Sequence, residues 1–169
     1  SIFLTFLGFM SLCFVSSANY VINDMLDRHK DRVHPEKRSR PIASGTVSVH
    51  NAFIVAVCLL GLALWLAYGL ALSFFVTVAA LFMLTSLYSL LLKNEPFVDI
   101  LLISINFVLR AISGTFILAA TISPWLIICT FFLSLFLSVA KRHADILFLG
   151  TKAVQHKPVL RFYTKTITN

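Results

Sequence analysis

The chain has 169 residues, of which 59% are hydrophobic and only 12% are charged, and its mean hydropathy is +0.90. Soluble domains average about 45–50% apolar and about 25% charged residues, so this composition excludes an ordinary soluble domain. Sixteen Phe against six Gly and five Pro also exclude a disordered or low-complexity polymer. The composition therefore predicts an integral membrane protein.

Long uncharged stretches predict five membrane-spanning helices. Residues 1–22 carry no charge, and residues 49–92 carry none over about twice the roughly 20 residues that one crossing needs. We therefore expect a helical hairpin at 49–92, with its turn near residues 68–70. A fourth span is expected at about 97–121, and a fifth is expected from about 124 to about 148.

The net charge of +7 is distributed as membrane topology requires. Thirteen of the fourteen Lys and Arg lie in residues 23–48, 93–96 and 141–169, which five alternating spans bring to one side. The two opposite turns carry none, and this asymmetry marks the basic side as cytoplasmic. We expect a bacterial plasma membrane as the location and membrane lipids as neighbours. Because topology accounts for the excess charge, nucleic acid is not expected as a partner.

A cluster of acidic residues lies at the end of the first span. On a helix, Asn23, Asp24, Asp27 and Asp31 all fall within about 100° of one face. Carboxylates so close repel one another unless a cation lies among them. Mg²⁺ takes such oxygen ligands, together with the phosphates of a substrate. The cluster predicts that the three aspartates bind Mg²⁺ at a diphosphate site, assisted by Asn23; the alternative is a solvated acidic helix end.

A basic loop follows the acidic cluster. Lys37, Arg38 and Arg40 lie between Pro35 and Pro41. The two prolines favour an extended loop, which would fold these cations back over a bound phosphate. The alternative is the ordinary cytoplasmic flanking of a membrane span by basic residues.

Polar residues also lie within and beside the later spans. Asp99, Asn106 and Arg110 share one face of the fourth span, with Arg110 roughly 20 Å along the helix axis. A charge at that depth faces either a wet cavity or a partner helix. We expect Arg110 and Asn106 to bind substrate in a cavity open to the cytoplasm; the alternative is a structural pairing of Arg110 with a neighbouring helix. Further candidates for substrate contact lie at the ends of spans: Tyr88, Lys93, Lys141, Arg142 and Asp145.

These motifs together resemble a known family. The acidic run over residues 23–31 and the basic run over 37–45 are similar to motifs of the UbiA-type intramembrane prenyltransferase superfamily, as are residues 88–93 and 99–114. The resemblance covers essentially the whole chain. It implies an all-α, polytopic transmembrane bundle of about nine spans. This chain would supply about five of them as a single membrane domain, residues 1–169, which we expect to be a piece of a longer protein.

One departure separates the branches of this family. Members that use a prenyl diphosphate carry a second DxxxD motif after the span that matches the fifth one here. This chain has Lys141-Arg142-His143-Ala144-Asp145 at that place, followed later by His156-Lys157-Pro158. The pattern, with one acid and two cations, resembles the decaprenyl-phosphate phosphoribosyltransferase branch. A basic pair would suit a donor that carries an additional phosphate.

The resemblance implies an enzyme that uses Mg²⁺ to transfer 5-phosphoribose from phosphoribosyl pyrophosphate to a polyprenyl phosphate, with release of pyrophosphate. Its partners would be a polyprenyl lipid and a diphosphate donor. The alternative within the family is prenyl transfer from a polyprenyl diphosphate to an aromatic or other acceptor. A membrane transporter is the alternative from another class, because an intramembrane arginine is equally natural there. Three carboxylates on one helix face are poorly explained by transport.

Overall fold

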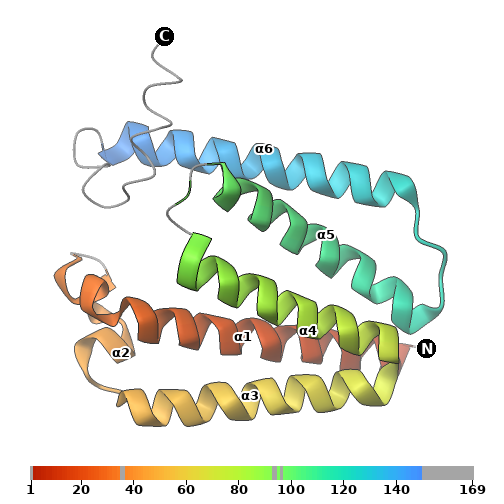
Figure 1. Cartoon of the computed structure of the whole chain (residues 1–169), viewed down its shortest axis with the longest axis horizontal. Coiled ribbons are helices and arrows are strands. Elements are labelled where there is room, and N and C mark those ends of the chain that lie inside the picture. The colour runs from red at the N-terminus through yellow and green to blue at the C-terminus, as the bar shows by residue number, and fades with distance from the viewer. Residues whose placement is uncertain (1, 35–36, 93–94, 96, 150–169) are drawn as a thin grey trace. The chain divides into compact units, whose positions relative to one another are not determined.

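The computed structural model describes residues 2–34, 37–92, 95 and 97–149 of the chain. Within them the fold is all-α, and five helical segments are long and apolar enough to cross a membrane (Figure 1). This confirms the predicted polytopic helical fold. The long helices are α1 (Ile2–Val33), α3 (Val49–Leu70), α4 (Leu72–Leu87), α5 (Val98–Leu118) and α6 (Pro124–Leu149), and a π-helical turn, η2 (Tyr88–Leu92), extends α4.

The first helix continues past its apolar stretch and through the acidic run to Val33. The helical register assumed for the carboxylates is therefore correct. The hairpin between α3 and α4 turns at Ala71, just beyond the predicted residues 68–70. Ala71 is extended, with a φ of −165°, and its backbone N–H still donates to the Ala67 carbonyl. A single non-helical residue is thus enough to separate the two spans.

The segment between α1 and α3 differs from the predicted extended loop. It forms a 3-10 turn, η1 (Lys37–Ser39), and a short helix, α2 (Pro41–Ser44). Pro41 starts α2 because its fixed φ suits a first helical position, and Gly45 ends α2 with a left-handed φ of 86°. Arg32 Nε donates to the Ala43 carbonyl at 2.9 Å, which ties α2 to the last turn of α1. Both η1 and α2 pack against α1. Whether their cations close over a bound phosphate stays a prediction.

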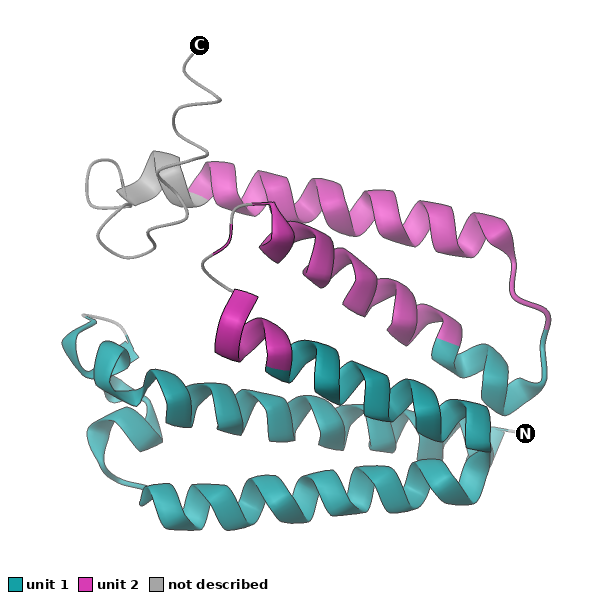
Figure 2. Cartoon of the chain, viewed as in Figure 1, with its two compact units in different colours: residues 1–86, 113–120 teal, residues 87–112, 121–169 magenta. Residues whose placement is uncertain are grey.

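The chain divides into two compact units (Figure 2). The first contains residues 1–86 and 113–120, and the second contains residues 87–112 and 121–169. The acidic run and the basic segment after it both belong to the first unit. The polar end of α6 and the start of α5 both belong to the second.

The core of the first unit lies where three helices meet. Val15 of α1 packs with Ala63 and Ala67 of α3 and with Phe74 and Val78 of α4, and all five side chains are buried. The two alanines allow the backbones of α1 and α3 to approach closely, which is how helices pack inside a bilayer. This packing holds α1 along the part that precedes the carboxylates.

Two hydrogen bonds fix the rotation of α1 within the first unit. Ser11 Oγ donates to the Ala63 carbonyl of α3 at 2.8 Å, and this contact is buried. Ser86 Oγ of α4 lies 3.3 Å from Asn19 Oδ1 of α1. Because α1 is one continuous helix, its rotation at these two points also determines which face the carboxylates occupy further along.

The outer surfaces of the long helices are apolar. Trp65 and Tyr68, in the last turns of α3, are each 71% exposed, and Trp125, in the first turn of α6, is 73% exposed. Aromatic side chains of this kind gather at membrane–water interfaces, where the ring is partly apolar and its edge is polar. The five apolar spans and these exposed aromatics belong to an integral membrane protein.

Candidate functional site

Two carboxylates of α1 meet one guanidinium in the first unit. Arg40 Nη1 donates to Asp24 Oδ1 at 2.7 Å and to Asp31 Oδ2 at 3.1 Å. Asp24 and Asp31 are about two helical turns apart and therefore lie on the same face of α1. Asp27 lies between them on that face by the same helical period. The helix thus supplies the carboxylates, and the residue just before α2 supplies the cation.

The site is open on one side. The side chain of Asp31 is only 6% exposed, whereas those of Asp24 and Arg40 are 28% and 39% exposed. A buried carboxylate is stable only when charge or hydrogen bonds compensate for its lost hydration. The partly exposed guanidinium of Arg40 compensates the buried carboxylate of Asp31 by its charge and its hydrogen bond.

The donor set fits a hard cation only in part. Within the portion of the chain that the structure describes, no three His, Cys, Asp or Glu side chains are grouped as a metal centre. Asp24 and Asp31, however, both direct an oxygen at the same cationic nitrogen. Mg²⁺ commonly binds one or two carboxylates and completes its shell with phosphate oxygens and water. The residues present therefore fit Mg²⁺ when a diphosphate supplies further oxygens.

The other predicted residues of this segment differ in burial. Asn23 and Asp27 are half-buried on α1. Lys37 is half-buried in η1, where its backbone N–H donates to His34 Nδ1 at 3.4 Å, and Arg38 is exposed. Of the basic residues predicted to close over a phosphate, Arg40 is the one that folds onto the aspartates. Phosphate contacts of Lys37 and Arg38 stay predictions.

The second unit contains a buried ion pair that the sequence did not predict. Arg142 of α6 donates to Asp99 Oδ2 of α5 through Nε at 3.0 Å and through Nη2 at 2.9 Å. The Asp99 side chain is fully buried, and that of Arg142 is 6% exposed. The other oxygen of Asp99 accepts from the Ile100 backbone N–H at 2.9 Å. Arg142, which was predicted to contact phosphate, is paired with Asp99 in this structure, and its phosphate contact stays a prediction.

A signal for this pair was present in the sequence. Asp99 lies about 19 residues before the end of α5, and Arg142 lies about 18 residues after the start of α6, so consecutive antiparallel helices bring them to the same depth. Opposite charges at one depth inside apolar helices are expected to pair, because leaving either alone in a bilayer is costly. From the sequence, Asp99 was placed on the polar face of the fourth span and Arg142 among the substrate contacts, so their pairing was not predicted.

The remaining predicted residues have varied surroundings. Asn106 Nδ2 donates to the Leu102 carbonyl at 3.2 Å, a contact within its own helix. Tyr88 is half-buried at the start of η2, and Arg110 and Lys141 have exposed side chains. Lys93 and the side chain of Asp145 lie outside the described residues.

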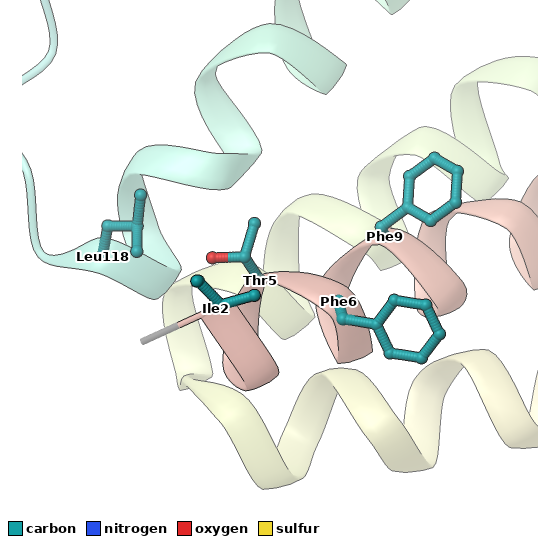
Figure 3. Close-up of a pocket in the computed structure, with 5 residues that line it drawn as sticks. All are labelled: Ile2, Thr5, Phe6, Phe9 and Leu118. Carbon is teal, nitrogen blue, oxygen red and sulfur yellow. The ribbon is translucent and has the colours of Figure 1, made fainter.

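A recess in the first unit lies away from the carboxylates. It is lined by side chains near the start of α1 and at the end of α5: Ile2, Thr5, Phe6, Phe9 and Leu118 (Figure 3). The carboxylates are near the opposite end of α1. The recess is apolar apart from Thr5, so it suits a hydrocarbon chain better than a diphosphate. It therefore adds nothing to the charged site.

Residues 1–146 match the model of the UbiA prenyltransferase family. The chain belongs to the UbiA prenyltransferase family. Its sequence is 36% identical to the decaprenyl-phosphate phosphoribosyltransferase of Corynebacterium glutamicum over 95% of this chain and 49% of that protein. The enzyme of the same name from Mycolicibacterium smegmatis is 33% identical over 94% of this chain and 50% of that protein.

Two other proteins extend the comparison beyond the phosphoribosyltransferases. A 4-hydroxybenzoate octaprenyltransferase of Legionella pneumophila is 38% identical, but over 52% of this chain and 31% of that protein. The structure of a UbiA homologue from Archaeoglobus fulgidus, bound to DMAPP and Mg²⁺, superposes with a TM-score of 0.81 at 24% identity. It covers 94% of this chain and 58% of that one, which shows the shared fold. The chain spans about half the length of the phosphoribosyltransferases it matches.

Proposed function

We propose that this UbiA-family chain belongs to a Mg²⁺-dependent transferase that moves 5-phosphoribose from phosphoribosyl pyrophosphate to a polyprenyl phosphate. The single observation that carries the proposal is the convergence of Asp24 and Asp31 on one cationic nitrogen. That geometry creates a place where carboxylate oxygens and a positive charge meet, as the metal complex of a diphosphate needs. Residues 1–169 would form part of a longer membrane domain, since its relatives are about twice as long.

The transfer step is a substitution at the anomeric carbon of the ribose. A phosphate oxygen of the lipid forms a bond to C1 while the bond from C1 to pyrophosphate breaks, and the leaving pyrophosphate keeps the electron pair. When bound, Mg²⁺ neutralises the charge that develops on that leaving group. Asp24, Asp27 and Asp31 would hold the metal, and Asn23 would assist them. Lys37, Arg38 and Arg40 would bind phosphate oxygens through charge-assisted hydrogen bonds.

The location of the site follows from the charge distribution. The acidic and basic runs belong to residues 23–48, which carry six of the fourteen Lys and Arg. The positive-inside rule places such a segment on the cytoplasmic side of a bacterial plasma membrane, where a soluble sugar-phosphate donor is available. The lipid acceptor would reach the site from the bilayer.

The choice of donor rests on the names of the relatives and on the basic end of α6. Two relatives that cover 94–95% of this chain are named decaprenyl-phosphate phosphoribosyltransferases. Of the two cations at the end of α6, Lys141 is exposed and Arg142 is paired with Asp99, so Lys141 is the more accessible one for an additional phosphate. Arg142 stays proposed as a substrate contact, as do Tyr88, Lys93, Asn106, Arg110 and Asp145.

Prenyl transfer to an aromatic acceptor is the second candidate. It is favoured by the Legionella pneumophila octaprenyltransferase, which matches about half of this chain at 38% identity. That reaction would break a bond between a prenyl carbon and a diphosphate, so the same carboxylates would be used. The two candidates differ in the donor, and a donor assay separates them.

The test supplies the full-length protein with two substrate mixtures in the presence of Mg²⁺. One mixture contains labelled phosphoribosyl pyrophosphate and a polyprenyl phosphate; the other contains a polyprenyl diphosphate and 4-hydroxybenzoate. We expect a lipid-linked phosphoribose product and pyrophosphate from the first mixture only, and none when the metal is chelated. Product from the second mixture only would replace the proposal with the prenyl-transfer reaction.

A further inference from the structure

Arg40 is the cation that the two carboxylates of α1 share, and these carboxylates are the proposed metal ligands. Its Nη1 contacts an oxygen of Asp24 and an oxygen of Asp31 at once, and it comes from the segment after α1 rather than from α1 itself. The guanidinium is therefore an internal cation that offsets part of the negative charge of the two carboxylates. It is also the most exposed member of the three, with 39% of its side chain accessible.

The same two carboxylates cannot bind both cations equally well. An ion such as Mg²⁺ would contact the carboxylate oxygens at about 2.0–2.1 Å, so it would lie close beside a guanidinium that contacts the same oxygens. The two positive charges would repel each other strongly at that separation. Binding of the metal to the oxygens that Arg40 contacts therefore requires Arg40 to move away, and a diphosphate is the partner to which a guanidinium would then turn.

We propose that Arg40 acts as a displaceable counter-cation, which keeps the metal out until the diphosphate donor arrives. The inference rests on the proposed function and specifies how its site is regulated. Without a donor, Asp24 and Asp31 hold the arginine. With a donor, its phosphates bind Arg40, and the carboxylates become available to the metal. Metal and donor thus bind with positive coupling, and each raises the affinity of the other by the same factor.

The position of Arg40 makes such an exchange feasible. Ser39 before it and Pro41 after it are both exposed, and Arg40 itself is extended, with a φ of −60° and a ψ of 141°. The side chain can swing without unfolding α2, because its guanidinium rather than its backbone contacts the carboxylates. Arg32 remains to tie α2 to α1 through the Ala43 carbonyl. The movement required is therefore confined to one long side chain.

The experiment measures binding of Mn²⁺ to the full-length protein in detergent by electron paramagnetic resonance, with and without inorganic pyrophosphate. We expect weak binding to the wild type alone and an increase of about 5–150-fold with pyrophosphate, the usual range for coupled sites. Arg40→Gln should bind Mn²⁺ alone about tenfold more tightly, which corresponds to about 1.4 kcal/mol. The same variant should show correspondingly less coupling.

Two further variants separate the charge of Arg40 from other effects. Arg38→Gln removes the same charge from the same segment, but Arg38 is exposed and, among the described residues, does not contact Asp24 or Asp31. It should leave the donor-free affinity for Mn²⁺ within about twofold of wild type. Arg40→Lys keeps a cation beside the aspartates and should bind Mn²⁺ with an affinity close to that of the wild type. Comparison of the two variants then separates the loss of charge in Arg40→Gln from a general effect of replacing Arg40. The thermal stabilisation of each variant by Mn²⁺ supplies a second readout.

The outcomes distinguish the inference from the proposed function. Equal donor-free affinity in wild type and Arg40→Gln, with coupling intact in both, overturns the counter-cation role and leaves the transferase proposal standing. A similar increase in Arg38→Gln also overturns it, because the effect is then general electrostatics. Absence of Mn²⁺ binding to the wild type even with pyrophosphate overturns both proposals.

Discussion

Replacing Arg142 with methionine should destabilise the protein by about 3–5 kcal/mol, because it leaves the carboxylate of Asp99 buried without its cation. Methionine keeps much of the length and volume of arginine, so the change removes charge more than packing. Asp99 is fully buried, and water cannot replace the lost guanidinium. The cost therefore comes from an uncompensated charge rather than from a cavity.

The contacts in the structure support this magnitude. Arg142 makes two charge-assisted hydrogen bonds to one oxygen of Asp99, at 2.9 and 3.0 Å. Hydrogen bonds to charged groups contribute about 1.5–3 kcal/mol each, so two of them account for the expected loss. In the variant, the Ile100 backbone N–H still donates to the other oxygen of Asp99, and this hydrogen bond limits the loss of unfolding free energy.

A double-mutant cycle measures the pair directly. The free energy of unfolding is determined in mixed micelles for Arg142→Met, for Asp99→Leu and for the double variant. Removing both partners should recover most of the loss, because no buried charge then remains; the expected coupling is about 2–3 kcal/mol. Lys141→Met is the matched control: Lys141 is the adjacent cation on the same helix, its side chain is exposed, and its loss should cost within about 0.5 kcal/mol.

One result would refute this reasoning. If Arg142→Met unfolds like the wild type while the KM for the donor rises about tenfold, Arg142 binds phosphate and its pairing with Asp99 contributes little. A cycle in which the two single losses simply add would contradict the pairing in the same way.

Three further predictions concern the site, the topology and the first unit. Asp24→Asn and Asp27→Asn should each lower kcat of the full-length enzyme by orders of magnitude in a pyrophosphate-release assay, since each removes a charged group from the proposed metal site. Near-normal turnover would show that the cluster is only a solvated helix end. In a cysteine-free background, an impermeant thiol reagent applied from one side should label Ser44→Cys or Ser123→Cys but not both, and equal labelling would contradict the five-span topology. Ser11→Ala should cost about 1 kcal/mol in unfolding free energy, because it breaks the buried bond between α1 and α3, and an unchanged stability would show that this bond does not hold α1.

Hydrophobic length and charge asymmetry were sufficient to predict the spans, because crossing a bilayer imposes both requirements on any sequence. The helical register of α1 was predictable for the same kind of reason. A 3.6-residue period acts locally, so residues 23–31 share a face whatever surrounds them. The five-helix fold and the face that carries the aspartates therefore follow from the sequence.

The segment between α1 and α3 was less predictable, because its conformation depends on competing local preferences. Two prolines favoured an extended loop, yet Pro41 is equally suited to the first position of a helix, and Gly45 is suited to end one. The bond from Arg32 to the Ala43 carbonyl is available only when that short helix forms. Tertiary contact thus selects between two conformations that the sequence alone allows.

The partners of the arginines were the hardest part to predict, and their exposure determines their consequences. Both Arg40 and Arg142 were expected to meet phosphate, and both meet carboxylates. The side chain of Arg40 is 39% exposed, so a diphosphate can compete with the aspartates for it. Arg142 is buried with Asp99, and if Arg142 changed partner, the carboxylate of Asp99 would stay buried without a cation. Of Lys141 and Arg142 at the basic end of α6, Lys141 is therefore the more readily exchangeable cation. If the donor carries an additional phosphate, Lys141→Gln should raise its KM by about tenfold with kcat little changed, and an unchanged KM would remove the basic end of α6 from the case for phosphoribosyl pyrophosphate.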